Sequence, residues 1–318
     1  MLSEHEWRAP ADRGPAPVVV AVDDAGTADG AVEWAAAEAG ARGCPLRIVH
    51  VARPPVPADP YCAPVPIGAV PTRLAAEAVL ADAVGRARTI ASDITVSTRL
   101  RHGATCRALL DEAARARLLA LGGSGPCGPL RALTGALTGE VAVRVAAHAS
   151  CPIVVVGPAP LPEDDRPPPR VVVGVDAASC GAAVGFAFDA ARQRGVPLVA
   201  VHAWQPDVPA DVGAPPGCLA MAEEQARLIL DRALDTWRAS SPDVPVHAVL
   251  VRDRPGPALA GQSRGAALLV VGSRGRGPLQ GAVFGSVSRT VLHRSRGPLA
   301  IVPQDRGPAP RSTWSPSV

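Results

Sequence analysis

The sequence predicts an α/β protein in which two copies of one domain, each with an open parallel sheet, follow each other along the chain. Its apolar runs are short, rich in β-branched residues and free of polar alternation, which is typical of strands covered on both faces. Alanine-rich segments of helical period lie between these runs, as at 28–41 and 220–237. Because strands and helices alternate, we expect about five parallel strands in each copy, with helices on both faces.

Landmarks of the first half return in the second half in the same order and at a nearly constant offset, which indicates a duplication. Each copy also carries a proline-rich insertion after its second strand, at 53–71 and 205–216, which is either a solvated loop or a flap over the strand ends. The matching segments are Val18–Asp23 with Val171–Asp176, Gly43–His50 with Gly195–His202, Leu118–Gly122 with Leu268–Gly272, and Cys151–Val156 with Gly297–Val302.

The duplication divides the chain into a first domain at 17–157 and a second domain at 170–303. The segment 158–169 between them is rich in proline, so it cannot continue a helix and favours an extended spacer. The tails at 1–16 and 304–318 are polar and proline-rich, and we expect them to fray.

Composition excludes several classes of function. The 318-residue chain contains no lysine and no asparagine, which removes the phosphate-binding loop ending in Gly-Lys-Ser/Thr, Schiff-base chemistry and N-glycosylation. A formal net charge of +3 is too small to indicate nucleic-acid binding, and the arginines between Arg86 and Arg117 have the helical spacing of solvated helix faces. Without a secretory signal or a stretch of about 18 apolar residues, no membrane association is expected. The seven scattered cysteines indicate reduced thiols in the cytoplasm.

The second copy contains a glycine pattern that favours anion binding. Its fourth strand runs into Gly272-Ser273-Arg274-Gly275, and Gly285-Ser286 follows before a segment of helical period at 287–294. Glycine lets the backbone approach a ligand closely, and the free amides of such a loop and of a helix start form an anion cradle. Ser286 can cap the helix or donate to a phosphate oxygen, and Arg274 adds the positive charge that lysine would otherwise supply.

With these motifs, the chain resembles a tandem universal stress protein. The resemblance covers about residues 17–157 and 170–303, and the ATP-binding pattern of that family, Gly-x-x-Gly-x9-Gly-Ser/Thr, is intact from Gly272 and Gly275 to Gly285-Ser286. The resemblance implies the strand order 3-2-1-4-5 in each Rossmann-like domain. It also implies pairing through the last strand, here as a pseudo-dimer within one chain, with a homodimer of chains as a further option.

The resemblance assigns further ligand contacts. The family holds the nucleoside with an aspartate at the end of the first strand, which falls on Asp176, close to Gly174 in the same strand end. The residue that touches the base falls on Ala203. The ligand implied is ATP or a related adenine nucleotide, and Mg²⁺ would accompany its phosphates. The spacing of the glycines alone supports only the anion cradle.

The first copy departs from this pattern. Gly122 and Gly125 keep the first two glycines. Aligning the final prolines of the two copies places Gly139 and Glu140 opposite the last glycine and the serine, so the loop is about four residues longer and the hydroxyl is lost. A rigid count of nine residues lands on Gly135 instead, also without a hydroxyl. Glu140 would repel a phosphate, although a carboxylate also suits the first turn of a helix.

Polar residues at the other strand ends have two interpretations. Asp176 either contacts the ligand in the crevice of the sheet or caps the next helix, and Asp23 is its equivalent in the first copy. His50 and His202 end equivalent strands, where a satisfied, half-buried histidine is commoner than a general base. Val51 follows His50 at the position that touches the base in the family.

We therefore expect a cytoplasmic stress-response protein that binds an adenine nucleotide, mainly in its second domain, and acts as a sensor or regulator. Two alternatives stay open. One is a slow ATP hydrolase or a nucleotidyl or phosphoryl transferase, which needs a base or arginine placed near the γ-phosphate. The other is a scaffold that binds no nucleotide. No Ser/His/Asp grouping has a nucleophile-elbow sequence, and we expect at most weak ATP hydrolysis.

Overall fold

The computed structural model describes residues 15–24, 26, 28–52, 73–123, 138–157, 167–176, 181–205, 217–273, 285–295 and 297–304. The first half contains β1 (Val18–Val22), α1 (Asp29–Arg42), β2 (Leu46–Ala52), α2 (Arg73–Ile90), β3 (Val96–His102), α3 (Thr105–Ala113), β4 (Leu118–Gly122), α5 (Thr138–His148) and β5 (Ile153–Val156). The second half contains β6 (Val171–Gly174), α6 (Gly181–Arg194), β7 (Leu198–Ala203), α7 (Cys218–Ser240), β8 (Val246–Val251), α8 (Pro255–Gln262), β9 (Leu268–Gly272), α9 (Ser286–Arg294) and β10 (Leu299–Val302).

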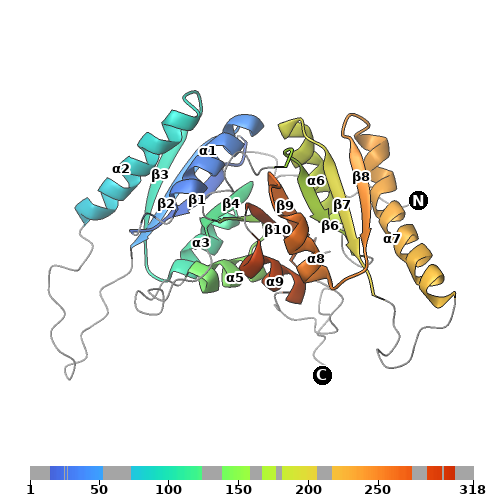
Figure 1. Cartoon of the computed structure of the whole chain (residues 1–318). Coiled ribbons are helices and arrows are strands. Elements are labelled where there is room, and N and C mark those ends of the chain that lie inside the picture. Colours follow the sequence, from blue (N-terminus) through green and yellow to red (C-terminus); the bar gives the residue numbers. More distant parts are fainter. Residues whose placement is uncertain are drawn as a thin grey trace, which may run out of the picture.

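The described strands form one sheet in the order β3-β2-β1-β4-β5-β10-β9-β6-β7-β8 (Figure 1). Within each half, neighbouring strands are parallel and follow the order 3-2-1-4-5. The fold class predicted from the sequence is therefore confirmed. The pairing through the last strand of each copy, which the family resemblance implied, joins the two sheets into one.

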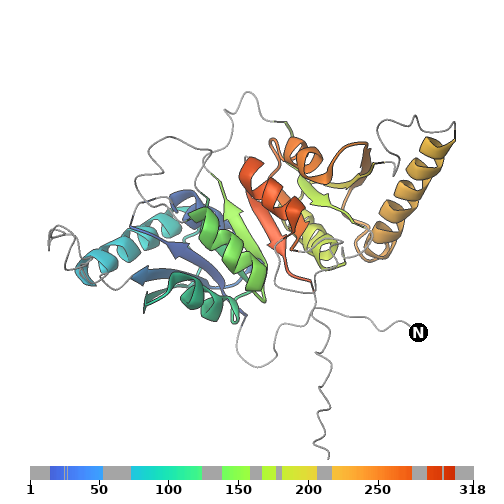
Figure 2. The same cartoon turned by 90° about the horizontal axis from the view of Figure 1, so that it is seen from below.

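The halves join where β5 and β10 pair in antiparallel orientation. Ala300 pairs with Val154, which is its own equivalent when the final prolines of the two copies are aligned, and Leu299 pairs with Val155. A pseudo-two-fold axis therefore passes through the middle of the junction. Figure 2 shows α5 and α9 on either side of it.

Helices cover both faces of the sheet, and each face has a core that runs through both halves. On one face of the sheet, strand residues such as Val20 and Val173 pack against α1, α2, α6 and α7. Their neighbours, such as Val19 and Val172, face the opposite way and pack against α3, α5, α8 and α9. Because both faces are covered, the strands need to be continuously apolar, which explains the lack of alternation in the sequence.

Several predicted features lie outside the described residues. These are the proline-rich insertions, apart from Gln205, most of the spacer at 158–169, and the tails apart from residues 15–16 and 304.

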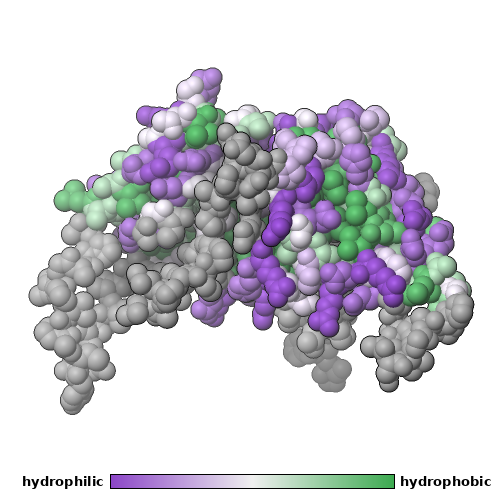
Figure 3. All heavy atoms as spheres, viewed as in Figure 1, coloured by the Kyte–Doolittle hydropathy of each residue, from purple (hydrophilic) through white to green (hydrophobic). Residues whose placement is uncertain are grey.

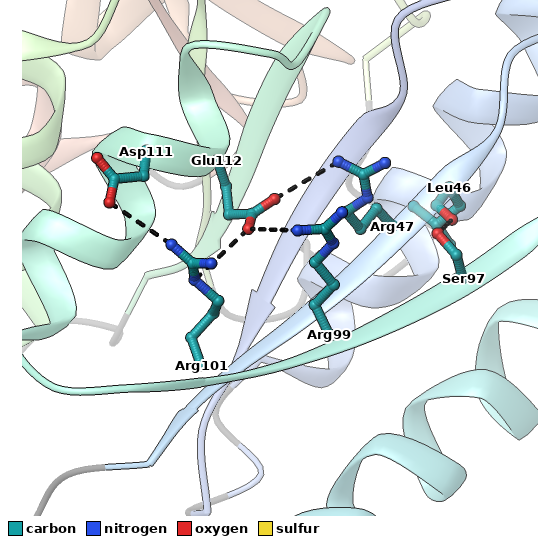
Figure 4. Close-up of polar contacts among 7 residues, drawn as sticks. All are labelled: Leu46, Arg47, Ser97, Arg99, Arg101, Asp111 and Glu112. Carbon is teal, nitrogen blue, oxygen red and sulfur yellow. Dashed lines mark hydrogen bonds and ion pairs between the residues drawn. The ribbon is translucent and has the colours of Figure 1, made fainter.

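The helical spacing predicted for the arginine-rich stretch is wrong for Arg99 and Arg101, which lie in β3 near the sheet edge. Two residues apart on a strand, they point to the same face of the sheet. There they meet the buried carboxylate of Glu112 at 3.8 and 3.7 Å, and Arg47 of β2 approaches the same carboxylate at 3.5 Å (Figure 4). Asp111 pairs with Arg101 at 3.5 Å. These arginines therefore cover the outer sheet of the first half.

The second half has valines in the equivalent places. By strand register, Val199, Val249 and Val251 replace the three arginines. Val199 is buried and the other two are half-buried. In the view of Figure 3, apolar side chains gather on the surface of the second half. The two copies thus differ in surface chemistry although their folds match.

Candidate functional site

A cleft of about 520 Å³ opens in the second half at the carboxyl ends of β6, β7 and β9. Its walls come from these strand ends, the first turn of α6, one face of α7, the start of α8 and the first turn of α9. Ligands of open α/β sheets bind at this edge, where the strand order reverses. The cleft is therefore the candidate ligand site.

Six of the eight residues predicted for a site in the second domain line this one cleft. Arg274 and Gly275 lie in the segment 274–284, outside the described residues. The six lining residues are Gly174, Asp176, Ala203, Gly272, Gly285 and Ser286. The fold thus brings together positions that are up to about a hundred residues apart in the sequence, and their contact with a ligand stays a prediction.

The amino terminus of α9 opens toward the cleft. Its cap residue, Gly285, has extended backbone angles, and none of the described side chains caps the helix. The amides of the first helical turn have no partner within a helix, and they carry the positive end of the helix dipole. Because Ser286, Val287 and Ser288 all line the cleft, this donor set suits an anionic group such as a phosphate.

Two hydrogen bonds fix where this helix starts. The Ser288 hydroxyl, in a side chain that is 2% exposed, donates to the Gly272 carbonyl at 2.8 Å. The Gly285 amide donates to the Ser273 carbonyl at 3.3 Å. Together they hold the two ends of the glycine loop against the end of β9.

The side chain of Leu259 in α8 fills the space beside Gly174. A Cβ atom at Gly174 would lie 2.8 Å from Cδ1 of Leu259. Both residues form part of the cleft wall.

His202 and His50 are buried and have the same partner in each half. Nδ1 of His202 lies 2.8 Å from the Val175 carbonyl, and Nδ1 of His50 lies 3.1 Å from the Val22 carbonyl. Since a carbonyl accepts, Nδ1 carries the proton in both rings. Each histidine thus ties its strand end to the end of the adjacent first strand, which fits the structural role favoured by the sequence.

Comparison with known proteins now decides the family. A model of the universal stress protein family matches the chain twice, over residues 16–157 and 169–303. The chain belongs to the universal stress protein family. A universal stress protein of Mycobacterium tuberculosis is 36% identical over 306 residues, covering 90% of this chain and 97% of that relative. Another, from Mycolicibacterium smegmatis, is 35% identical over 297 residues, covering 90% and 96%.

A crystal structure shows the same fold at low sequence identity. The universal stress protein from Archaeoglobus fulgidus aligns with a TM-score of 0.60 at 16% identity, covering 91% of this chain and 97% of that chain. The resemblance inferred from the glycine pattern is therefore confirmed as to family and fold.

Some cleft residues of this universal stress protein were missed by sequence reasoning. Trp204, Gln225, Ile229 and Asp253 line the cleft, although only Ala203 was predicted near the base. Trp204 directly follows that residue, and its amide donates to the Val251 carbonyl at 2.9 Å, which holds this end of β7 against β8. Neither the glycine pattern nor the helical period of α7 marked Gln225 or Ile229 as cleft residues.

The weaker site predicted in the first half is not assembled in the same way. A smaller cavity of about 290 Å³ lies between the loop after β1, α1 and α2, and of the first-domain predictions it includes Asp23 but neither Val51 nor Gly122. Gly139 lies in the first turn of α5, and Gly125 is outside the described residues. Contact of these first-domain positions with a ligand stays a prediction.

The smaller cavity has an acidic wall. Besides Asp23, its wall carries three more carboxylates, from Asp24, Asp29 and Asp82. Arg86 contacts two of them, at 3.3 Å from Asp29 and 3.2 Å from Asp82. An acidic wall of this kind disfavours a phosphate.

The described part of the chain offers neither a metal centre nor a membrane-spanning helix. No group of three or more metal-ligating side chains lies close enough together there to hold a metal ion. None of the helices that the structure describes has the length and apolarity needed to cross a membrane.

Proposed function

We propose that the second domain binds ATP or a related adenine nucleotide, and that the protein acts in the cytoplasm as a stress-response sensor or regulator. The observation that carries this proposal is the cleft at the carboxyl edge of the sheet. There the open amino terminus of α9 and the side chain of Asp176 border the same space as the apolar wall around Ala203.

Each part of the nucleotide has a matching wall in this proposal. The phosphates lie at the first turn of α9, where Ser286 and the free amides donate to their oxygens. Asp176 accepts from the ribose hydroxyls. The base lies against Ala203, with Trp204 and Ile229 as further apolar surface. Mg²⁺ would arrive with the phosphates, which supply oxygen ligands that the ion prefers.

The proposal restricts binding mainly to the second domain. Among the described residues, the first domain offers acidic side chains at its cavity, and Glu140 stands in the first turn of α5. A triphosphate would meet like charge at both places. We therefore expect the first domain to bind a nucleotide weakly or not at all.

The test is isothermal titration of the full chain with ATP, ADP and cyclic AMP, with and without Mg²⁺. Gly275→Glu adds a carboxylate and a side chain to the loop of the second domain, and Gly125→Glu makes the matched change in the first. We expect one nucleotide per chain, lost in Gly275→Glu and retained in Gly125→Glu. The reverse pattern would show that the first domain is the binding domain, and an absence of binding in the unmodified chain would favour a scaffold.

A time course of phosphate release separates regulation from catalysis. We expect release far slower than about one per second, because typical enzymes turn over at that rate or faster. Faster release that is abolished by Gly275→Glu would instead support the hydrolase alternative.

A further inference from the structure

A second contact joins the two halves besides the β5–β10 pairing. Glu38 of α1 is 2% exposed, and its carboxylate accepts from Nε of Arg42 on the same helix at 2.5 Å. The other carboxylate oxygen accepts from Nη2 of Arg194 on α6, in the other half of the chain. One buried carboxylate thus holds two guanidinium groups, one from each domain.

The two arginines occupy equivalent places in a symmetrical arrangement. Each ends its helix directly before a glycine with left-handed backbone angles, Gly43 at φ 58° and Gly195 at φ 62°. Arg42 lies over the ring of Phe186 at 5.4 Å, and Arg194 lies over the ring of Trp34 at 5.8 Å. Aligning Gly43 with Gly195 makes Trp34 the equivalent of Phe186. The two cation–π contacts are therefore reciprocal across the pseudo-two-fold axis.

The carboxylate breaks this symmetry. The second-domain equivalent of Glu38 is Ala190, which is fully buried. The cluster therefore holds two positive charges and one negative charge. Within the described residues, Nη2 of Arg42 is buried without a hydrogen-bond partner.

These observations determine the charges of every pairing of domains through this surface. A first domain against a second gives the arrangement seen here. Two first domains would bring two arginines and two glutamates together. Two second domains would bury two facing arginines with no carboxylate, and an uncompensated buried charge is strongly destabilising.

We propose that Glu38 is the residue that selects the partner of this surface. The face formed by α6 and β10 accepts a domain that carries a carboxylate at the position of Glu38, which in this protein is the first domain, and rejects a second copy of itself. Strand edges pair readily without regard to sequence, so β10 alone would not make this distinction. The carboxylate of Glu38 makes this distinction. Pairing of the first domain with the second domain of the same chain is therefore favoured over association of two chains through their second domains.

The test uses the full chain. Glu38→Ala gives the natural pair the charges that a pair of second domains would have. We expect a fall of roughly 5–15 °C in the unfolding midpoint, because breaking a buried ion pair leaves the remaining charges uncompensated. We also expect faster hydrogen exchange of the β5 and β10 amides, which a loss of stability elsewhere in the chain would not produce selectively.

The decisive variant moves the carboxylate to the symmetry-related position. In Glu38→Ala/Ala190→Glu the total side-chain volume is conserved, and the new glutamate lies four residues before Arg194 and across from Arg42. We expect this variant to regain at least half of the fall in the unfolding midpoint temperature. We also expect it to restore slow hydrogen exchange of the β5 and β10 amides. The control Glu38→Ala/Ala190→Gln has the same shape without the charge, and it should recover neither.

The proposal is overturned if Glu38→Ala leaves both the midpoint and the junction exchange unchanged. It is also overturned if the glutamate and glutamine double variants behave alike. Should Glu38→Ala fail to fold, the comparison of the two double variants still decides, since only the charged one is expected to fold.

Discussion

Replacing Ser288 by alanine tests whether the start of α9 forms the phosphate end of the cleft. The side chain is 2% exposed, and its hydroxyl donates to the Gly272 carbonyl at 2.8 Å. Losing a buried hydrogen bond costs about 1–3 kcal/mol, and the lower part of that range applies because cleft water can reach the carbonyl. If the bond positions the amides of α9, about 1.4 kcal/mol of it appears in binding, which is about tenfold weaker affinity for ATP.

A matched control separates positioning from general destabilisation. Ser263 is also 2% exposed, and it donates to the Ala260 carbonyl at 2.7 Å, at the far end of α8 from the cleft. Ser263→Ala should therefore lower the free energy of unfolding about as much as Ser288→Ala while leaving ATP affinity unchanged. The assays are titration calorimetry and urea denaturation. Equal loss of affinity in both variants, or in neither, would refute the positioning role.

Three further predictions concern the framework. Glu112→Gln should cost about 1–3 kcal/mol in urea denaturation, because three arginines lose one buried partner, whereas Asp111→Asn, at a half-exposed pair, should cost less than about 0.5 kcal/mol. Gly185→Ala should destabilise the chain by about 1–3 kcal/mol, because its Cβ would lie 2.3 Å from the ring of Trp237. Burial raises the pKa of the Cys151 thiol from 9.0 to about 12. The protonated thiol therefore stabilises the fold fully below pH 9, and this contribution is lost as the pH rises toward 12. Thermal unfolding scans of Cys151→Ala should lack this alkaline loss of stability.

Each of these predictions has a contrary result. Equal effects of the Glu112 and Asp111 variants would mean that burial of the carboxylate adds nothing to the cluster. An unchanged midpoint in Gly185→Ala would mean that α7 shifts away from α6 without loss of packing. Identical alkaline unfolding of the unmodified chain and of Cys151→Ala would mean that this thiol does not contribute to the pH dependence.

The sequence predicted features that depend on local pattern and on repetition. Continuous apolar runs marked the strands, and the second copy of each run established the tandem order. The cleft could be placed because the glycine pattern follows a buried strand, at the edge where parallel strands present their carboxyl ends. These inferences need only periodicity and chain order.

The features that were missed depend on contacts distant in sequence. Arg99 and Arg101 stand two residues apart, which suits one face of a strand, and the partner that they share, Glu112, lies in the next helix. The residues alone did not mark the pairing of β5 with β10, which only the family resemblance implied, since an apolar strand looks the same in the middle of a sheet and at a junction. Arg194 lies 156 residues from Glu38, so no local pattern connects them.

The two copies differ at the positions on which the two proposals rest. With the final prolines aligned, α5 has Ala142 where α9 has Ser288, so the first domain lacks the hydroxyl that holds the helix start against the glycine loop. It has acidic side chains around Asp23 where an anion would need donors. Conversely, the carboxylate that joins the halves is present only in the first domain, at Glu38. In the two proposals made above, the copies therefore have separate tasks: the first copy supplies the charge that holds the pair together, and the second copy supplies the cleft for the ligand.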